Sequence, residues 1–248
     1  MILLNDLNLN GNFRRQHRWL GLALGAALMA GAGTSSVQAD QVTTAPNFGP
    51  YHAAAGEFTM LPDAGVTAML GAYSPYTMNY VQTGSFQTFC VERDEFITPN
   101  TTFDVTSNQV TTFSGIPLSA GAAYLYQQFA TGNLAYNYAD APTGARTTVG
   151  FADAWMLQNA LWFLMGELSG QENNPYVLQA DNALGGIRAT FAPDNGAHNV
   201  SVLNLWAPNQ PHDPQHSYQD VLIYNAVPEP STAALLSLAA LFTLRRKH

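Results

Sequence analysis

The sequence predicts an α+β domain, a β-sandwich or barrel-like domain with a helical insertion. Segments rich in β-branched and aromatic residues, with turn signals between them, fill residues 58–113 and return after Gly185-Gly186. Between these two regions, apolar residues recur at the spacing of an α-helix. The domain expected over residues 40–226 also has a length that one hydrophobic core can serve.

Four strands are expected in the first region. Dipeptides that contain proline, such as Pro62-Asp63 and Ser74-Pro75, separate them and mark turns. The third strand carries Cys90, the only cysteine of the chain. The four expected strands cover residues 65–70, 78–82, 86–97 and 101–110.

Helices are expected to form the insertion. The first, residues 118–131, has apolar residues at helical spacing and ends at Gly132-Asn133. The second, residues 154–167, follows Asp153 as its cap and is apolar nearly all round, which is typical of a buried helix. The remaining elements are one shorter helix and two strands, expected at residues 176–183, 200–206 and 221–226.

Residues 1–39 have the pattern of a secretory signal peptide. Arg14, Arg15 and Arg18 precede a short apolar stretch, and Val37-Gln38-Ala39 offers a small-residue cleavage site. We therefore expect the chain to be exported and the folded domain to begin after this segment.

Residues 227–248 combine a proline-bounded tripeptide, an apolar run and a basic tail. The apolar run, residues 231–244, is shorter than the about 20 residues that span a bilayer. Its positively charged end is expected on the cytoplasmic side of a membrane. The residues of the tripeptide and of the tail are Pro228, Glu229, Pro230, Arg245, Arg246 and Lys247.

This carboxyl-terminal segment resembles the PEP-CTERM sorting signal, which exosortase-type membrane enzymes recognise in Gram-negative, exopolysaccharide-producing bacteria. The resemblance implies an exosortase-type processing enzyme as a partner and tethering to the inner membrane by a short transmembrane helix before processing. It also implies delivery to the cell envelope or the extracellular matrix. A plain hydrophobic helix is the alternative interpretation.

The charge of residues 40–226 excludes one class of partner. Three basic residues, Arg93, Arg146 and Arg188, stand against fifteen acidic residues, so the formal net charge is −12, and the segment contains no lysine. Such a surface repels nucleic acid and anionic polysaccharide unless a cation intervenes. We therefore expect no nucleic-acid partner.

Cys90 and Gln158 are the candidate functional residues. Strand alternation places Thr88, Cys90 and Glu92 on one face, so Cys90 is expected among polar neighbours. Gln158 falls within the apolar second helix, where an amide without hydrogen-bond partners costs about 1–3 kcal/mol. Attack of the Cys90 thiolate on the Gln158 side-chain carbonyl would release ammonia and leave an internal thioester.

The segments around these two residues resemble the two motifs of bacterial thioester domains in the surface adhesins of Gram-positive organisms. Phe89-Cys90-Val91-Glu92 is similar to the first motif, and Leu157-Gln158-Asn159-Ala160-Leu161, followed by Trp162, is similar to the second. The resemblance implies that Cys90 supplies the thiol and Gln158 the acyl group of an electrophile that captures amines on surfaces. It implies neither a cofactor nor catalytic turnover, because the reaction happens once.

The leading prediction is therefore an exported adhesin of the cell surface or matrix that captures amines, a protein of biofilms and not an enzyme. The alternative is a noncovalent structural or binding protein of the exopolysaccharide matrix, in which Cys90 is inert and Gln158 hydrogen-bonds a neighbouring backbone. A cysteine hydrolase comes third, because it would need a histidine beside Cys90 as its base. The acidic run Glu92, Asp94 and Glu95 favours a solvated strand end over a Ca²⁺ site, so no metal is expected.

Overall fold

The computed structural model describes residues 39–46, 51–52, 55–79, 82–138, 148–210 and 213–226. The expected signal peptide, except for Ala39, and the whole expected sorting segment 227–248 lie outside these residues. Among the described residues, no helix is both long enough and apolar enough to cross a membrane.

Six antiparallel strands form the main sheet, in the order β5-β4-β1-β6-β7-β8. Its two end strands meet through the residues that follow β5, where Cys90 forms a bridge with Val221. The sheet is therefore nearly closed and barrel-like, as expected. The strands are β1 (Gln41–Thr44), β4 (Phe58–Pro62), β5 (Phe86–Thr88), β6 (Thr102–Gln109), β7 (Val200–Trp206) and β8 (Ser217–Tyr224).

Alternate residues of the strands serve two separate cores. On β8, Val221 and Ile223 point into the barrel, whereas Leu222 and Tyr224 point to its outer face. This is the period of two that a strand imposes on its side chains. A strand buried on both faces reads as continuously apolar, which is what the chain shows from residue 221 to 224.

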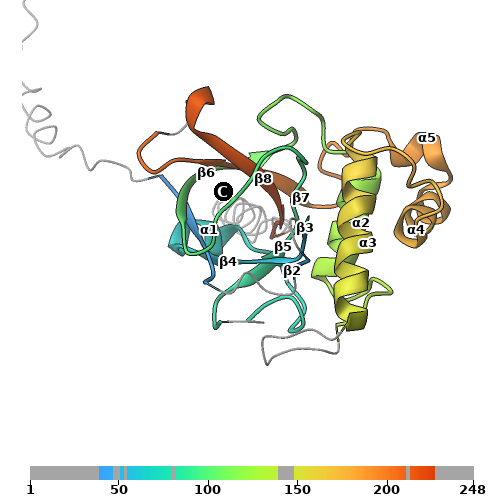
Figure 1. The fold of residues 1–248 in the computed structure, drawn as a ribbon, viewed down its shortest axis with the longest axis horizontal. Coiled ribbons are helices and arrows are strands. Elements are labelled where there is room, and N and C mark those ends of the chain that lie inside the picture. The colour runs from blue at the N-terminus through green and yellow to red at the C-terminus, as the bar shows by residue number, and fades with distance from the viewer. Residues whose placement is uncertain are drawn as a thin grey trace, which may run out of the picture. The chain divides into compact units, whose positions relative to one another are not determined.

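Four helices of the described chain lie to one side of the barrel, and α2 covers part of its outer face. Figure 1 shows them gathered beside the sheet, and α2 lies against β7 and β8. The helix α3 also lies against a small hairpin formed by β2 (Tyr51–His52) and β3 (Ala55–Gly56). The four helices are α2 (Ala120–Ala130), α3 (Thr148–Leu164), α4 (Pro175–Leu184) and α5 (Ile187–Thr190).

Strong local signals correctly predicted several elements. The expected strands 101–110 and 200–206 correspond to β6 and β7, and the expected helices 118–131 and 176–183 correspond to α2 and α4. Each of these two helices has an amino-terminal cap, from Ser119 and Asn174, and α4 ends at Gly185 in the left-handed conformation.

The strand expected at residues 65–70 is wrong, because this segment forms the helix α1 (Ala64–Met69) beside β1 and β4. Asp63 explains the difference: its carboxylate accepts hydrogen bonds from the backbone N–H groups of Val66 and Gln41, both at 2.8 Å. This cap starts a helix where the β-branched Val66 and Thr67 favour a strand.

Other element boundaries also differ from the prediction. The strand expected at 86–97 is only β5, with an isolated bridge at Cys90. Of the strand expected at 78–82, the described residues form a bridge from Met78 to Phe86, and residues 80–81 lie outside the described part of the chain. The strand expected at 221–226 begins earlier, at Ser217, after the short 3-10 turn Pro214–His216.

Asp153 does not cap the buried helix, because α3 already begins at Thr148. Its carboxylate instead accepts a hydrogen bond from the backbone N–H of Asn137, at 2.8 Å. The helix is buried nearly all round from Leu157 onward, as expected, but Trp155 is 40% exposed.

Candidate functional site

Cys90 lies at the seam where the barrel closes. The backbone C=O of Phe89 accepts from Leu222 N–H at 3.2 Å, and Val91 N–H donates to the C=O of Asp220 at 3.1 Å. In an antiparallel pair, successive residues direct their N–H and C=O groups to opposite edges. The backbone groups of Cys90 therefore point away from β8, toward an edge that β4 does not reach, since β4 begins at Phe58 opposite Thr88.

Gln158 occupies this free edge. Its side-chain Oε1 accepts from the Cys90 N–H at 3.1 Å, and its Nε2 donates to the Cys90 C=O at 2.8 Å. The carboxamide thus pairs with Cys90 as the backbone of a neighbouring strand would. The structure brings together two residues that are 68 positions apart in the sequence.

The Cys90–Gln158 pair is closed to solvent. Cys90 and Gln158 both have 0% exposure, and Cys90 contacts Phe58 and Trp162. Cys90 therefore lies on a core face, which corrects the expectation, although the charge of Glu92, one of its expected polar neighbours, does act on the thiol. Strand alternation correctly separates Cys90 from Phe89, since the two residues pack in different clusters.

The thiol is held in its neutral form. Burial raises the pKa of Cys90 well above its ordinary value, and the charge of Glu92 raises it further. Cys90 is a free thiol in this structure. Because the thiolate is the nucleophilic form of cysteine, reaction at this position requires control of the nearby charge.

The segment after Cys90 is held by hydrogen bonds from α3 and from β8. Trp162, one turn after Gln158 on α3, donates from Nε1 to the backbone C=O of Glu92 at 3.2 Å, and Gln219 Nε2 donates to the same oxygen. These two bonds fix Glu92 relative to the helix and to β8. Trp162 therefore helps to hold the segment after Cys90 in place.

The acidic run beside Cys90 is only partly solvated, which corrects the expectation of a solvated strand end. Asp94 is exposed, but Glu92 is 5% exposed and Glu95 is half-buried. A third buried carboxyl group, Asp220 on β8, has 0% exposure. Burial and the charges of Glu92 and Glu95 raise the pKa of Asp220 to about 8, against the lowering effect of its hydrogen bonds.

Sequence reasoning did not identify Asp220 as part of this site. Asp220 is the one charged residue of β8 and directly precedes its apolar run, residues 221–224. An aspartate is almost never fully buried unless it is paired. That contrast is the signal that could have found it.

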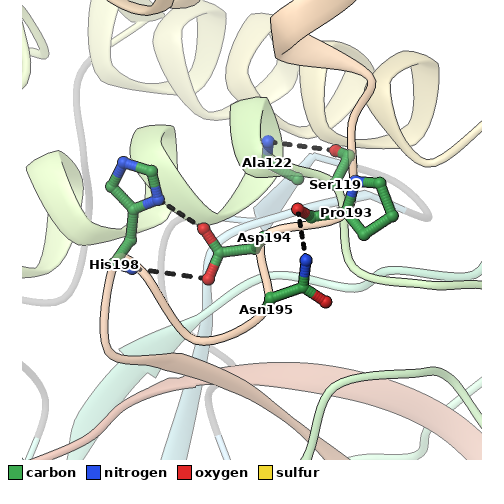
Figure 2. Close-up of polar contacts among 6 residues, drawn as sticks. All are labelled: Ser119, Ala122, Pro193, Asp194, Asn195 and His198. Carbon is green, nitrogen blue, oxygen red and sulfur yellow. Dashed lines mark hydrogen bonds and ion pairs between the residues drawn. The ribbon is translucent and has the colours of Figure 1, made fainter.

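The described residues do not place a histidine beside Cys90 in any hydrogen bond. His198 directs both its backbone N–H and its ring Nδ1 to the carboxylate of Asp194, as Figure 2 shows. His216 contacts Asp213 at 2.8 Å in an exposed turn. The same figure shows Ser119 bonded to the Ala122 N–H, as the cap of α2, so its hydroxyl is directed to the helix and not to His198.

Within the described part of the chain, no group of three or more histidine, cysteine or acidic residues is arranged to hold a metal ion. The predicted sorting residues Pro228, Glu229 and Pro230 and the basic tail lie outside the described residues. The only predicted site on which the structure bears is therefore the Cys90–Gln158 pair.

Comparisons of this chain with protein-family models, with curated proteins and with solved structures found no match.

Proposed function

We propose that the chain is an exported surface protein that captures amines through an internal thioester between Cys90 and Gln158. The observation that carries the proposal is the direct pairing of the Gln158 carboxamide with the Cys90 backbone at a fully buried position. This pairing holds the acyl carbon of Gln158 next to the residue that bears the thiol. Proximity of this kind replaces a collision between two groups by a unimolecular step.

The chemistry balances as two acyl transfers. In the first, the Cys90 sulfur bonds to the Gln158 side-chain carbon, the carbon–nitrogen bond breaks, and the thiol proton leaves with the amide nitrogen as ammonia. In the second, a surface amine attacks the same carbon, the carbon–sulfur bond breaks, and Cys90 returns as a thiol. The protein then remains attached through an amide bond.

The composition supports this proposal. Residues 40–226 contain no lysine, so the electrophile has no side-chain amine of its own domain to capture. The apolar surroundings of Cys90, with Phe58 and Trp162, also exclude the water that would hydrolyse a thioester.

Delivery is the second part of the proposal. The tripeptide Pro228-Glu229-Pro230, the apolar run and the basic tail support processing by an exosortase-type enzyme at the inner membrane. Release to the envelope or the matrix would bring the domain to its amine-bearing targets.

A noncovalent matrix protein is the second candidate, and one observation favours it. Both hydrogen-bonding ends of the Gln158 carboxamide are already satisfied by the Cys90 backbone. In this alternative Gln158 completes the edge of the sheet, and Cys90 is a small buried residue of the barrel.

The intact mass of the mature protein decides between the two candidates. We expect the wild-type mass to be lower by one ammonia, and we expect methylamine to add its own mass and free one thiol, which leaves the product heavier than the full-mass chain by one CH2 group. The variants Cys90→Ala and Gln158→Ala should both have their full mass, and Asn159→Ala, one position along the helix, should behave as the wild type. A full wild-type mass with an unreactive thiol would leave the noncovalent candidate.

A further inference from the structure

Two buried carboxyl groups are held by the same turn next to the Cys90 seam. The hydroxyl of Ser114 donates to Glu92 Oε1 at 2.7 Å, and the backbone N–H of Phe113 donates to Asp220 Oδ2 at 2.6 Å. Asn204 on β7 adds a second donor to Asp220 Oδ2, also at 2.6 Å. Consecutive residues of one turn thus orient the two carboxyl groups.

The other oxygen of each group has no partner. Glu92 Oε2 and Asp220 Oδ1 are buried and accept no hydrogen bond within the described structure. The charged groups that act on Asp220 are Glu92 and Glu95, both negative, and the described residues give none of the three an ion pair with an arginine. Asn204 and the Phe113 N–H, which face Asp220 from β7 and from the turn, are neutral.

Two buried carboxylates in this arrangement cannot both ionise at low cost. Removing one charge from water is already expensive, and a second negative charge nearby adds repulsion that no cation offsets here. Retention of one proton by the pair removes the repulsion and the cost of burying a second charge, and it gives one of the unpartnered oxygens a hydrogen to donate.

The pair lies beside the reacting residues. Val91 N–H bonds to the backbone C=O of Asp220, and Glu92 follows Cys90 by two residues in the chain. The charge of Glu92 acts directly on the Cys90 thiol. Any proton that the pair gains or loses therefore changes the charge that the sulfur experiences.

We propose that Glu92 and Asp220 are positioning residues that share one proton and thereby limit the negative charge next to Cys90 when the thioester forms and opens. The proposal rests on the proposed thioester. Both acyl transfers develop negative charge on the sulfur, because the thiolate attacks in the first and leaves in the second. One shared proton keeps the neighbouring charge at a single unit, and its loss would add a second unit and slow both steps.

The pH profile of thioester opening tests this proposal. The rate of opening by hydroxylamine, divided by the fraction of unprotonated amine, should fall in the wild type above a pH of about 8, by up to about tenfold per pH unit. Asp220→Asn keeps the shape and the acceptor oxygen and adds an N–H where the shared proton would be. Its corrected rate should therefore stay level across the same range.

Two further variants sharpen the test. Glu92→Gln should also lack the fall above a pH of about 8, because ionisation of Asp220 then brings the neighbouring charge only to the single unit that the wild type carries below this pH. Asp94→Asn removes an exposed carboxyl group of the same segment and should keep the wild-type profile. A merely structural role of Asp220 would change stability but not the profile of opening.

The outcomes separate this inference from the proposed function. A wild-type protein of full mass would remove both. A thioester present in wild type and in Asp220→Asn, with identical pH profiles, would overturn the shared proton and leave amine capture standing. A folded Asp220→Asn protein without a thioester would also overturn it, because a neutral side chain should be sufficient.

A stability measurement checks the proton itself without the thioester. The folded-state pKa of Asp220 is raised, so the folded protein binds more protons than the unfolded chain between the ordinary value of 3.8 and about 8. Stability in the Cys90→Ala background should therefore decrease as the pH rises through this window. Asp220→Asn should remove that decrease, and an unchanged slope would contradict the proposal.

Discussion

At the scale of single residues, the site depends on the Gln158 side chain, whose carboxamide takes the place of a backbone peptide group. The Gln158 carboxamide presents one acceptor and one donor with the spacing of a peptide group, and it bonds both the N–H and the C=O of Cys90. Buried backbone groups are almost always paired. Gln158 therefore has a structural role in any function of the protein, and the proposed thioester would replace two hydrogen bonds by a covalent bond.

The structural role can be measured apart from the covalent one. In a Cys90→Ala background, where no thioester can form, Gln158→Ala should lower the free energy of unfolding by about 2–6 kcal/mol, because two buried backbone groups lose their partners. Urea denaturation of Cys90→Ala with and without the second change measures this difference. The matched control is Asn159→Ala in the same background, at a half-buried position. A loss below about 1 kcal/mol would show that water or another group satisfies Cys90.

At the scale of elements, caps decide where helices begin. Ser119 is extended, and its hydroxyl accepts from the Ala122 N–H at 3.2 Å, which fixes the start of α2 (Figure 2). The helix then places Ala122, Leu125 and Phe129 in the core between the helices and the barrel. An error in this start would displace the helix that covers β7 and β8.

Loss of the α2 cap has a predictable cost. Ser119→Ala should reduce the free energy of unfolding by about 1 kcal/mol, because the N–H of Ala122 loses its partner in a buried position. Thermal or urea unfolding measures the effect, with Ser169→Ala at an exposed position as the control. Equal stabilities of the two variants would mean that the hydroxyl does not cap the helix.

At the scale of the described domain, one short segment joins two cores. Phe89 points to the helices, where its ring meets the ring of Phe129 edge-on with centroids 4.9 Å apart. Cys90 packs with Phe58 of β4 and Trp162 of α3, and the backbone of the same segment closes the sheet against β8. The proposed thioester would thus form where the sheet and the helices meet.

Truncation at this junction should be costly. Phe89→Ala should destabilise the domain by about 3–5 kcal/mol, because the removed ring leaves a cavity in the core between the helices and the barrel. Phe96→Ala is a matched control seven residues along the same segment, since Phe96 is 68% exposed, and it should change stability by less than about 0.5 kcal/mol. Denaturant unfolding of both variants makes the comparison. Similar losses in the two proteins would argue against a junction at Phe89.

Local signals were sufficient for part of the fold and of the site. The helical spacing of apolar residues in 118–131, the stop at Gly132-Asn133 and the apolar run of β7 each act within a few residues, so α2 and β7 could be predicted. The resemblance of two short segments singled out Cys90 and Gln158, but that the Gln158 amide finds its partner in the Cys90 backbone came from the structure.

The rest depended on contacts between distant parts of the chain. The sequence by itself determined which residues carry the candidate chemistry, the acidic charge of the domain and its most regular elements. Only the tertiary structure decided that residues 89–91 close the barrel, that Gln158 completes their free edge, and that Asp220 joins Glu92 at one turn. The physical reason is that burial and charge proximity arise from packing, which local pattern does not encode: the pKa of Asp220 is raised to about 8 first by its burial and then by the charge of Glu92, and both arise only in the folded chain.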